Sequence, residues 1–160
     1  MDDIVDIHIY IYALNILIFA LMIPLFLASV LMDPGYLKPR YDFRCLVELA
    51  LDLGLHLDSL CCHCEVIKSD TSFHCTICDK CVELFDHHCP FINNCLGHRN
   101  YKYFLGFISL YSLYYILLLI DSSIHLVSVS SEYGFEKVYK DSMFIICWIL
   151  ILLHFPILFN

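Results

Sequence analysis

Long apolar runs constrain the fold of this chain more than any other feature. They cover residues 4–32, 103–129 and 143–159. About 20 apolar residues are enough to cross the hydrocarbon core of a bilayer as a helix. Lipid offers no partners to unpaired backbone groups, so a spanning segment must be a helix or part of a closed barrel. We therefore predict an integral membrane, mainly α-helical protein with three transmembrane helices at these positions.

Composition agrees with a membrane protein and argues against a nucleic-acid-binding one. Hydrophobic residues make up 60% of the 160 residues, and charged residues make up 16%. Soluble domains carry about 25% charged residues. The net charge of -8 provides no basic stripe for phosphate groups. We expect membrane lipid among the partners and no nucleic acid.

The segment 33–102 lies between the first two apolar runs and is polar by comparison. It holds all but one of the ten cysteines. Asp33-Pro34-Gly35 is expected to end the first helix, because proline cannot continue it and glycine supplies a turn. Apolar residues at helical spacing between residues 43 and 57 predict a short amphipathic helix. No internal repeat is expected.

The basic residues predict the orientation of the chain. Seven of the nine Lys and Arg residues lie in segment 33–102, and the other two lie in segment 130–142. The positive-inside rule assigns the segment richer in basic residues to the cytosol. We therefore expect 33–102 to be a cytosolic domain and 130–142 a lumenal linker. The expected location is an endomembrane (ER or Golgi) or the plasma membrane.

The spacing of cysteines and histidines predicts zinc binding in segment 33–102. Zinc prefers four tetrahedral sulfur or nitrogen ligands. Eight candidates therefore give two closed structural sites, each with three cysteines and one histidine. Two candidates are adjacent in the chain and must point in different directions, which indicates that the sites interleave. Disulfides are the weaker alternative in a cytosolic segment. The candidates are Cys61, Cys64, His74, Cys75, Cys78, Cys81, His88 and Cys95.

That assignment leaves Cys89 of this segment without a metal role. Cys89 lies next to His88 and two residues after His87, which itself follows Asp86. A cysteine beside an unbound histidine that has its own carboxylate has the arrangement of a nucleophile, a base and an orienting group. Spacing alone leaves two alternatives to this nucleophile interpretation open. In them, Cys89 is either an alternate metal ligand or an inert buried thiol.

At this point the sequence resembles the DHHC-type protein S-acyltransferases, also called palmitoyltransferases. The resemblance rests on the zinc-ligand pattern followed by Asp86-His87-His88-Cys89-Pro90. Further matches are Asn93-Asn94-Cys95-x-Gly97-x2-Asn100-x3-Phe104 and the Asp33-Pro34-Gly35 turn after the first helix. The expected fold is a set of three membrane helices around a cytosolic, zinc-binding Cys-rich domain.

The resemblance implies an enzyme that moves a palmitoyl group from palmitoyl-CoA to cysteine thiols of substrate proteins. Cys89 would carry the acyl group, His87 would act as base, and Asp86 would orient it. The implied substrates are proteins with juxtamembrane cysteines. The resemblance also implies the grouping of the two structural zinc sites. One would be Cys61, Cys64, His74 and Cys81, and the other Cys75, Cys78, His88 and Cys95.

Two further residues are assigned to the acyl donor by the resemblance. Phe91 stands where the family usually has Trp, and its ring offers an apolar contact to acyl-CoA. Tyr114 matches a position that faces the acyl cavity and limits chain length, with ordinary helix packing as an equal alternative. Lys68-Ser69-Asp70-Thr71 replaces the usual Lys-Pro-x-Arg. The family usually has a second helix before the Cys-rich domain and a Thr-Thr-x-Glu motif after the last one, so we expect a truncated or partial member.

Two other functions compete with acyl transfer. The runner-up is a catalytically inactive membrane adaptor that keeps the zinc fold. The third is a membrane-anchored, RING-like ubiquitin ligase, whose zinc ligands also interleave. A ubiquitin ligase has no use for Asp86, His87 or Cys89 and is therefore the weakest of the three. Acylation of Cys89 discriminates between the enzyme and the adaptor.

Overall fold

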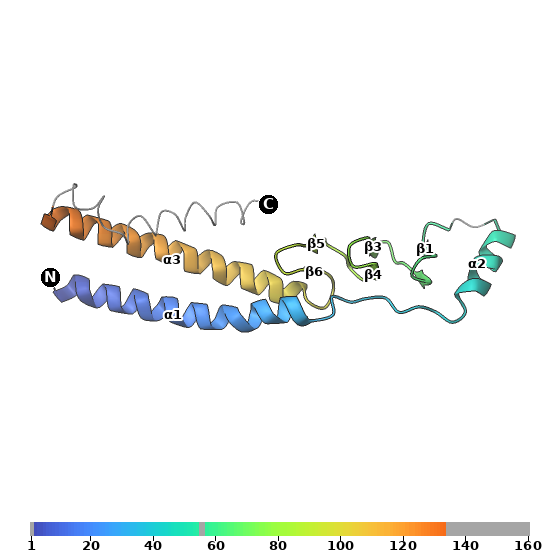
Figure 1. Cartoon of the computed structure of the whole chain (residues 1–160), viewed down its shortest axis with the longest axis horizontal. Coiled ribbons are helices and arrows are strands. Elements are labelled where there is room, and N and C mark those ends of the chain that lie inside the picture. Colours follow the sequence, from blue (N-terminus) through green and yellow to red (C-terminus); the bar gives the residue numbers. More distant parts are fainter. Residues whose placement is uncertain (1, 55–56, 134–160) are drawn as a thin grey trace. The chain divides into compact units, whose positions relative to one another are not determined.

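The computed structural model describes residues 2–54 and 57–133. This part of the chain contains three helices and three short antiparallel hairpins (Figure 1). The helices are α1 (Asp2–Leu31), α2 (Phe43–Asp52) and α3 (Tyr101–Tyr133). The strands are β1 (Leu60–Cys61), β2 (Val66–Ile67), β3 (Phe73–Cys75), β4 (Lys80–Val82), β5 (His88–Cys89) and β6 (Asn94–Cys95).

Within the described residues, two helices are long and apolar enough to cross a membrane. The candidate spans are Ile7–Leu31, with a mean hydropathy of 2.5, and Tyr101–Ser128, with a mean hydropathy of 1.9. Both are longer than the ~20 residues that a crossing requires. Helix α3 continues past residue 129, where the sequence predicts its end. The third predicted span, 143–159, lies outside the described residues, as does most of the predicted 130–142 linker.

The chain divides into two compact units. The first contains the N-terminal part of α1 and the C-terminal part of α3. This unit consists of Met1–Phe19 and Tyr111–Asn160. Within its described part, His8 Nδ1 lies 2.8 Å from a carboxylate oxygen of Asp121. The rings of Phe19 and Tyr114 lie 6.2 Å apart. Polar groups within apolar helices are expected to pair with one another, as His8 and Asp121 do.

The second unit, Ala20–Leu110, contains the hairpins and the sharp end of α1. Asp33 Oδ1 accepts hydrogen bonds of 2.8 Å from the backbone N–H groups of Gly35 and Tyr36. Gly35 has a φ of 112°, a conformation that suits glycine. The predicted helix stop at Asp33-Pro34-Gly35 is therefore confirmed. The chain then runs beside β4, where Tyr36 pairs with Val82.

Helix α2 forms where helical periodicity predicts it but is shorter than predicted. It covers Phe43–Asp52 rather than 43–57. The N–H group of Leu53 still bonds to the carbonyl of Leu49, but Gly54 then adopts a φ of 65°. Glycine in the left-handed region is a common helix terminator. Phe43 is the buried residue of this helix.

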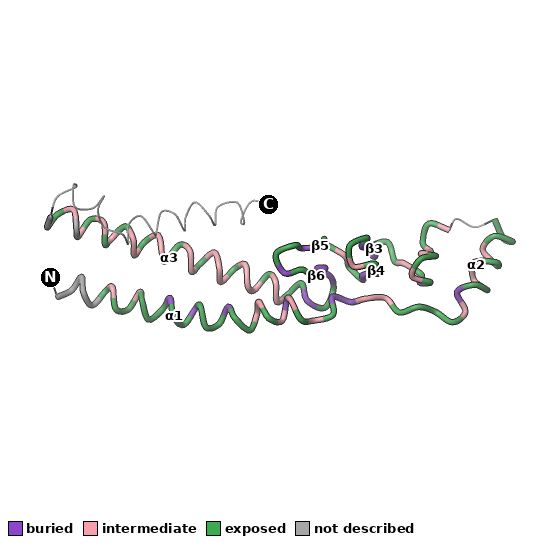
Figure 2. The backbone as a smooth tube through the Cα atoms, viewed as in Figure 1, coloured by how far each residue is buried: buried purple, intermediate pink, exposed green. Residues whose placement is uncertain are grey.

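The hydrophobic cores of the second unit are small and lie at the hairpins (Figure 2). One contains Cys75, Val82 and Cys95. The other contains Cys89, Ile92 and Leu96, packed against Phe26, Val30 and Phe104. Cores of this size stabilise a domain weakly, and small domains commonly add metal ions or disulfides. The geometry of the cysteines is therefore central to the stability of this unit.

The three hairpins repeat along the chain, and the expectation of no internal repeat is wrong. Cys61, Cys75 and Cys89 end the first strand of each hairpin at intervals of 14 residues. Glu65, Asp79 and Asn93 follow at the same interval, with φ values of 55°, 54° and 47°. The repeat lies in backbone conformation and cysteine position. Most other residues differ, which hides it in the sequence.

Candidate metal and thiol site

The first group of candidate ligands comes from two successive hairpins. Cys61 and Cys64 lie in the first hairpin, and His74 and Cys81 face each other across β3 and β4. His74 Nδ1 lies 3.8, 3.2 and 3.8 Å from the sulfurs of Cys61, Cys64 and Cys81. All four ligand atoms lie within 4.8 Å of one another. Tetrahedral zinc with bonds of about 2.3 Å separates its sulfur ligands by about 3.8 Å, so the donor set fits that ion.

The second group repeats this arrangement one hairpin later. Cys75 and Cys78 lie in the second hairpin, and His88 and Cys95 face each other across β5 and β6. His88 Nδ1 lies 3.8, 3.3 and 3.7 Å from the sulfurs of Cys75, Cys78 and Cys95. These ligand atoms also lie within 4.8 Å of one another. The adjacent residues His74 and Cys75 thus belong to different groups.

Local electrostatics divide the thiols into two kinds. Burial raises the pKa of Cys75, but the N–H groups of Cys78 and Ile77 donate toward its sulfur, and the net pKa is lowered. Cys61 follows the same pattern in the first hairpin. Burial and the neighbouring thiols raise the pKa of Cys95. A bound cation would stabilise all of these sulfurs as thiolates and release their protons.

A carboxylate lies beside the first group of ligands. Asp79 Oδ1 lies 2.7 Å from His63 Nε2 and 3.6 Å from His74 Nε2. His74 faces the sulfurs with Nδ1, so its Nε2 is the outer nitrogen. A carboxylate near the outer nitrogen of a ligating histidine orients the ring and raises its basicity. Sequence reasoning missed Asp79, although it directly follows the ligand Cys78.

Cys89 belongs to neither group among the residues that the structure describes. It lies at the end of β5, opposite Asn94 of β6. Its exposed fraction is 3%, and it packs with Ile92 and Leu96 in an apolar cluster. The fold therefore keeps this sulfur apart from the eight candidate ligands.

Asp86 and His87 form a carboxylate–imidazole pair just before β5. His87 Nδ1 lies 3.3 Å from Asp86 Oδ2, and both side chains are 50% exposed. The His87 ring packs edge-on against Phe104, with 6.4 Å between ring centroids. Because Nδ1 faces the carboxylate, Nε2 is the nitrogen left to exchange protons. Within the described part of the chain, no hydrogen bond joins His87 to the Cys89 sulfur.

Two buried asparagines hold the Cys89 hairpin to the end of α1. Asn94 Nδ2 lies 3.1 Å from the carbonyl of Val30 and 2.9 Å from that of Met32. Asn100 Nδ2 donates to the carbonyls of Ser29 and Cys95. The last carbonyls of a helix lack partners within the helix, and these carboxamides supply them. In the sequence, both residues stand out only as part of a motif.

Gly97 lies where β6 turns toward α3, and it has no room for a side chain. A Cβ atom there would lie 2.5 Å from Val82 Cγ1 and 2.6 Å from the Pro34 carbonyl. The turn after α1, strand β4 and the segment after β6 therefore meet at Gly97. This close approach explains why a glycine is required at this point.

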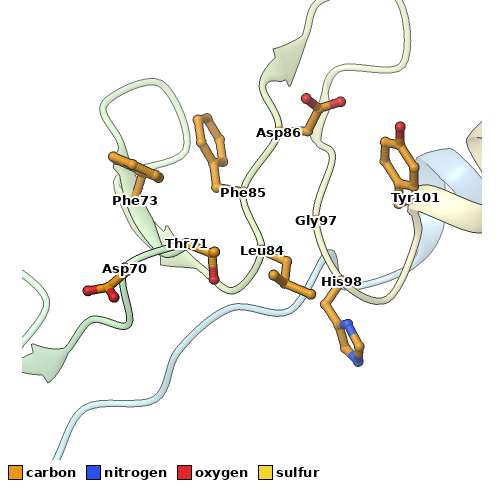
Figure 3. Close-up of a pocket in the computed structure, with 9 residues that line it drawn as sticks. All are labelled: Asp70, Thr71, Phe73, Leu84, Phe85, Asp86, Gly97, His98 and Tyr101. Atoms are coloured by element: carbon orange, nitrogen blue, oxygen red, sulfur yellow. The ribbon is translucent and has the colours of Figure 1, made fainter.

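An open pocket of about 520 Å³ lies beside Asp86 (Figure 3). Its lining includes the carboxyl groups of Asp70 and Asp86 and the ring of His98. The aromatic rings of Phe73 and Phe85 lie 6.2 Å apart on its wall. Within this lining the two carboxylates make the local charge acidic.

Of the residues assigned to the acyl donor, Phe91 is 58% exposed and Tyr114 packs against Phe19.

Comparison with known proteins gives one matching family and several relatives. The model of the DHHC palmitoyltransferase family matches residues 55–160. Palmitoyltransferase Hip14 of Drosophila melanogaster is 41% identical over 87 residues, which is 52% of this chain and 14% of that protein. Palmitoyltransferase ZDHHC5-B of Danio rerio is 33% identical over 135 residues, 78% of this chain and 18% of that protein. The matches thus cover less than a quarter of either relative.

Proposed function

Because the chain belongs to the DHHC palmitoyltransferase family, we propose that it acts as a protein S-acyltransferase with Cys89 as the acyl carrier. The donor is palmitoyl-CoA, and the acceptors are cysteine thiols of substrate proteins. One observation carries this proposal. Cys89 lies outside both candidate metal groups and follows a carboxylate–imidazole pair in the chain.

The two Cys3His groups are proposed to hold two structural zinc ions. Each group supplies four ligands, so neither leaves an open position for water or substrate. Bound zinc would join each hairpin to the next and fix β5 within the domain. The observations in support are the interligand distances and the small hydrophobic cores.

The proposed reaction consists of two thioester exchanges. In the first, the Cys89 sulfur attacks the thioester carbonyl of palmitoyl-CoA, a new S–C bond forms, and the CoA sulfur leaves. His87 Nε2 accepts the Cys89 proton and returns it to the departing sulfur, while Asp86 holds the ring through Nδ1. In the second, the thiol of a substrate protein forms a new S–C bond with the acyl carbonyl, and its proton passes through His87 to the departing Cys89 sulfur. Both steps exchange one thioester for another, so positioning matters more than driving force.

The membrane is proposed to hold the acyl chain and the substrate proteins near Cys89. Helices α1 and α3 contain the candidate spans that flank the hairpins in the chain. We assign 33–102 to the cytosol, 130–142 to the lumen and 143–159 to a third span, in an ER, Golgi or plasma membrane. The exposed ring of Phe91 is proposed to contact acyl-CoA, and Tyr114 to limit the length of the acyl chain.

The alternative of an inactive adaptor is favoured by one observation. Cys89 is only 3% exposed, and a buried thiol suits a structural role. Acylation therefore requires that acyl-CoA or a local movement expose this sulfur. A chain that keeps the zinc fold without forming an acyl thioester would be an adaptor.

Three neighbouring substitutions test the proposed enzyme. The purified chain is incubated with palmitoyl-CoA, and hydroxylamine-labile acyl groups and zinc are measured in parallel. Cys89→Ser should keep zinc and lose the acyl adduct. His87→Ala should keep zinc and slow acylation by about 10²- to 10⁴-fold, the usual contribution of a general base. His88→Ala should lose zinc, because it removes a ligand. A wild-type chain that forms no adduct would favour the adaptor.

A further inference from the structure

The third hairpin has the same backbone construction as the two that supply metal-ligand cysteines. Cys61 pairs with Val66, Cys75 with Lys80, and Cys89 with Asn94, so each cysteine occupies the same register position. A residue with positive φ precedes the second strand in all three hairpins. The turn after Cys89 is therefore built like a metal-binding turn.

The ligand spacing extends this repeat to a third set of positions. Both candidate metal groups place their four ligands at successive intervals of 3, 10 and 7 residues. The same intervals counted from Cys89 lead to Ile92, Lys102 and Ser109. The third set therefore keeps the first cysteine and has no ligand-type side chain at the position of the second.

The structure shows what these three replacing residues do instead. Ile92 is 3% exposed and packs in one cluster with Cys89 and Leu96. Lys102 places its ammonium group 5.0 Å from the centroid of the Tyr103 ring. The Ser109 hydroxyl donates to the carbonyl of Leu105 within α3. Helix α3 begins at Tyr101, so within the described residues no fourth hairpin completes a third metal group.

We propose that the Cys89 turn is a third metal-binding turn in which Ile92 replaces the second thiol, and that Ile92 thereby keeps Cys89 free of metal. A turn with two cysteines chelates a soft cation through two thiolates, whereas a single thiolate gives no chelate. Ile92 is thus a positioning residue. It leaves the turn geometry intact and removes only the second ligand. The assignment rests on the proposed function solely for what the free thiol does.

Restoring a thiol at this position tests the proposal. The zinc-loaded chain carrying Ile92→Cys is mixed with one equivalent of Cd²⁺, and alkylation of Cys89 is followed by peptide mass spectrometry. We expect Cd²⁺ to slow alkylation of Cys89 by at least about 10-fold, since two thiolates then share the ion. Ile92→Ala, which opens the same cluster without adding a ligand, should show no protection. A cadmium–thiolate absorption band should be stronger in Ile92→Cys than in Ile92→Ala.

A second variant keeps the test decisive. Ile92→His supplies a nitrogen ligand at the same position and should also protect Cys89 in the presence of Cd²⁺. Absence of protection in zinc-loaded Ile92→Cys and Ile92→His would overturn the proposal. Loss of the resident zinc in both variants would also count against it, because a turn of this geometry accommodates a second ligand. If the wild type forms no acyl adduct while Cd²⁺ protects Cys89 in Ile92→Cys, only the proposed function fails.

Discussion

Cys89 faces Asn94 across the third hairpin, and the Asn94 carboxamide donates at 2.9 Å to the carbonyl of Met32 just after α1. The strand that carries the unassigned thiol is thus attached to the end of a candidate membrane helix by its own cross-strand neighbour. Asn94 Oδ1 also accepts a 2.9 Å hydrogen bond from the Cys95 N–H group. The hairpin of β5 and β6 is therefore connected to the end of α1 through Asn94.

Replacing Asn94 should destabilise this connection. Asn94→Ala leaves the partly buried carbonyl groups of Val30 and Met32 without that donor, at a cost of about 1–3 kcal/mol in the free energy of unfolding. The control is the exposed Asn93→Gly, which keeps a residue suited to the φ of 47°. Thermal unfolding in detergent measures both. Equal stability of Asn94→Ala and wild type would contradict the role assigned to the carboxamide.

Gly97 should tolerate no side chain, whereas Gly106 should. Gly97→Ala places Cβ within 3 Å of Val82, Pro34 and Glu83 atoms, two of which are backbone oxygens. We expect loss of folded protein or a loss of several kcal/mol in the free energy of unfolding. Gly106→Ala meets only Leu25 at 3.4 Å and lies within α3, so it should be neutral or stabilising by up to about 1 kcal/mol. Yield and thermal unfolding of the two variants give the comparison.

The Asp79 carboxylate should strengthen the first metal group and leave the second unchanged. Asp79→Asn should weaken zinc binding there by about 10-fold, the lower end for partners of ligating histidines. Competition with a chelator, followed by alkylation of Cys64 and Cys78 peptides, reports each group separately. The control is Ile77→Ala. Ile77 lies in the second hairpin at the position equivalent to that of His63 in the first hairpin. Equal weakening at both groups would refute a local effect.

Asp33 should make the turn after α1 sensitive to acid. Burial raises its pKa, but hydrogen bonds from Tyr36 and Gly35 and the charges of Arg99 and Lys80 outweigh burial, and the net pKa is lowered. A lowered folded-state pKa gives stability that is complete above the unfolded value of ~3.9 and lost as pH falls through the folded value. The stability difference between wild type and Asp33→Asn should thus stay constant from pH 7 to pH 5 and shrink below about pH 4. Denaturant unfolding of both proteins at each pH measures it, and a difference that stays unchanged at low pH would exclude this role.

The helices could be predicted from the sequence because lipid leaves an apolar run few alternatives. The first two runs are helical in the structure, and α1 ends at Leu31, one residue short of the predicted turn. The predicted helix bounds are wrong where the helices end in polar or glycine-containing segments. In α3, which continues to Tyr133, the hydroxyls of Ser130 and Ser131 bond to backbone carbonyls of the preceding turn, so these polar side chains are satisfied within the helix. In α2, the effect of Gly54 on the helix end depends on its backbone conformation, which apolar periodicity does not report.

The candidate site was only partly predictable for a different physical reason. Ligand spacing singles out cysteines and histidines, because metal geometry restricts which residue types occur and where. The roles of Asn94 and Asn100 depend on the end of α1 lying beside β6, which is a tertiary contact. The third copy of the 14-residue repeat is difficult to recognise in the sequence, because Ile92, Lys102 and Ser109 stand at its ligand positions.

Native mass spectrometry of the chain after incubation with palmitoyl-CoA tests the central claim most directly, because one spectrum reports zinc and acyl groups together. The account predicts two zinc ions and one acyl group on the wild type, with two zinc ions and no acyl group on Cys89→Ser. Peptide mapping should place the acyl group on Cys89. An acyl group retained by Cys89→Ser, or zinc lost from it, would contradict the separation of the eight ligands from the Cys89 thiol.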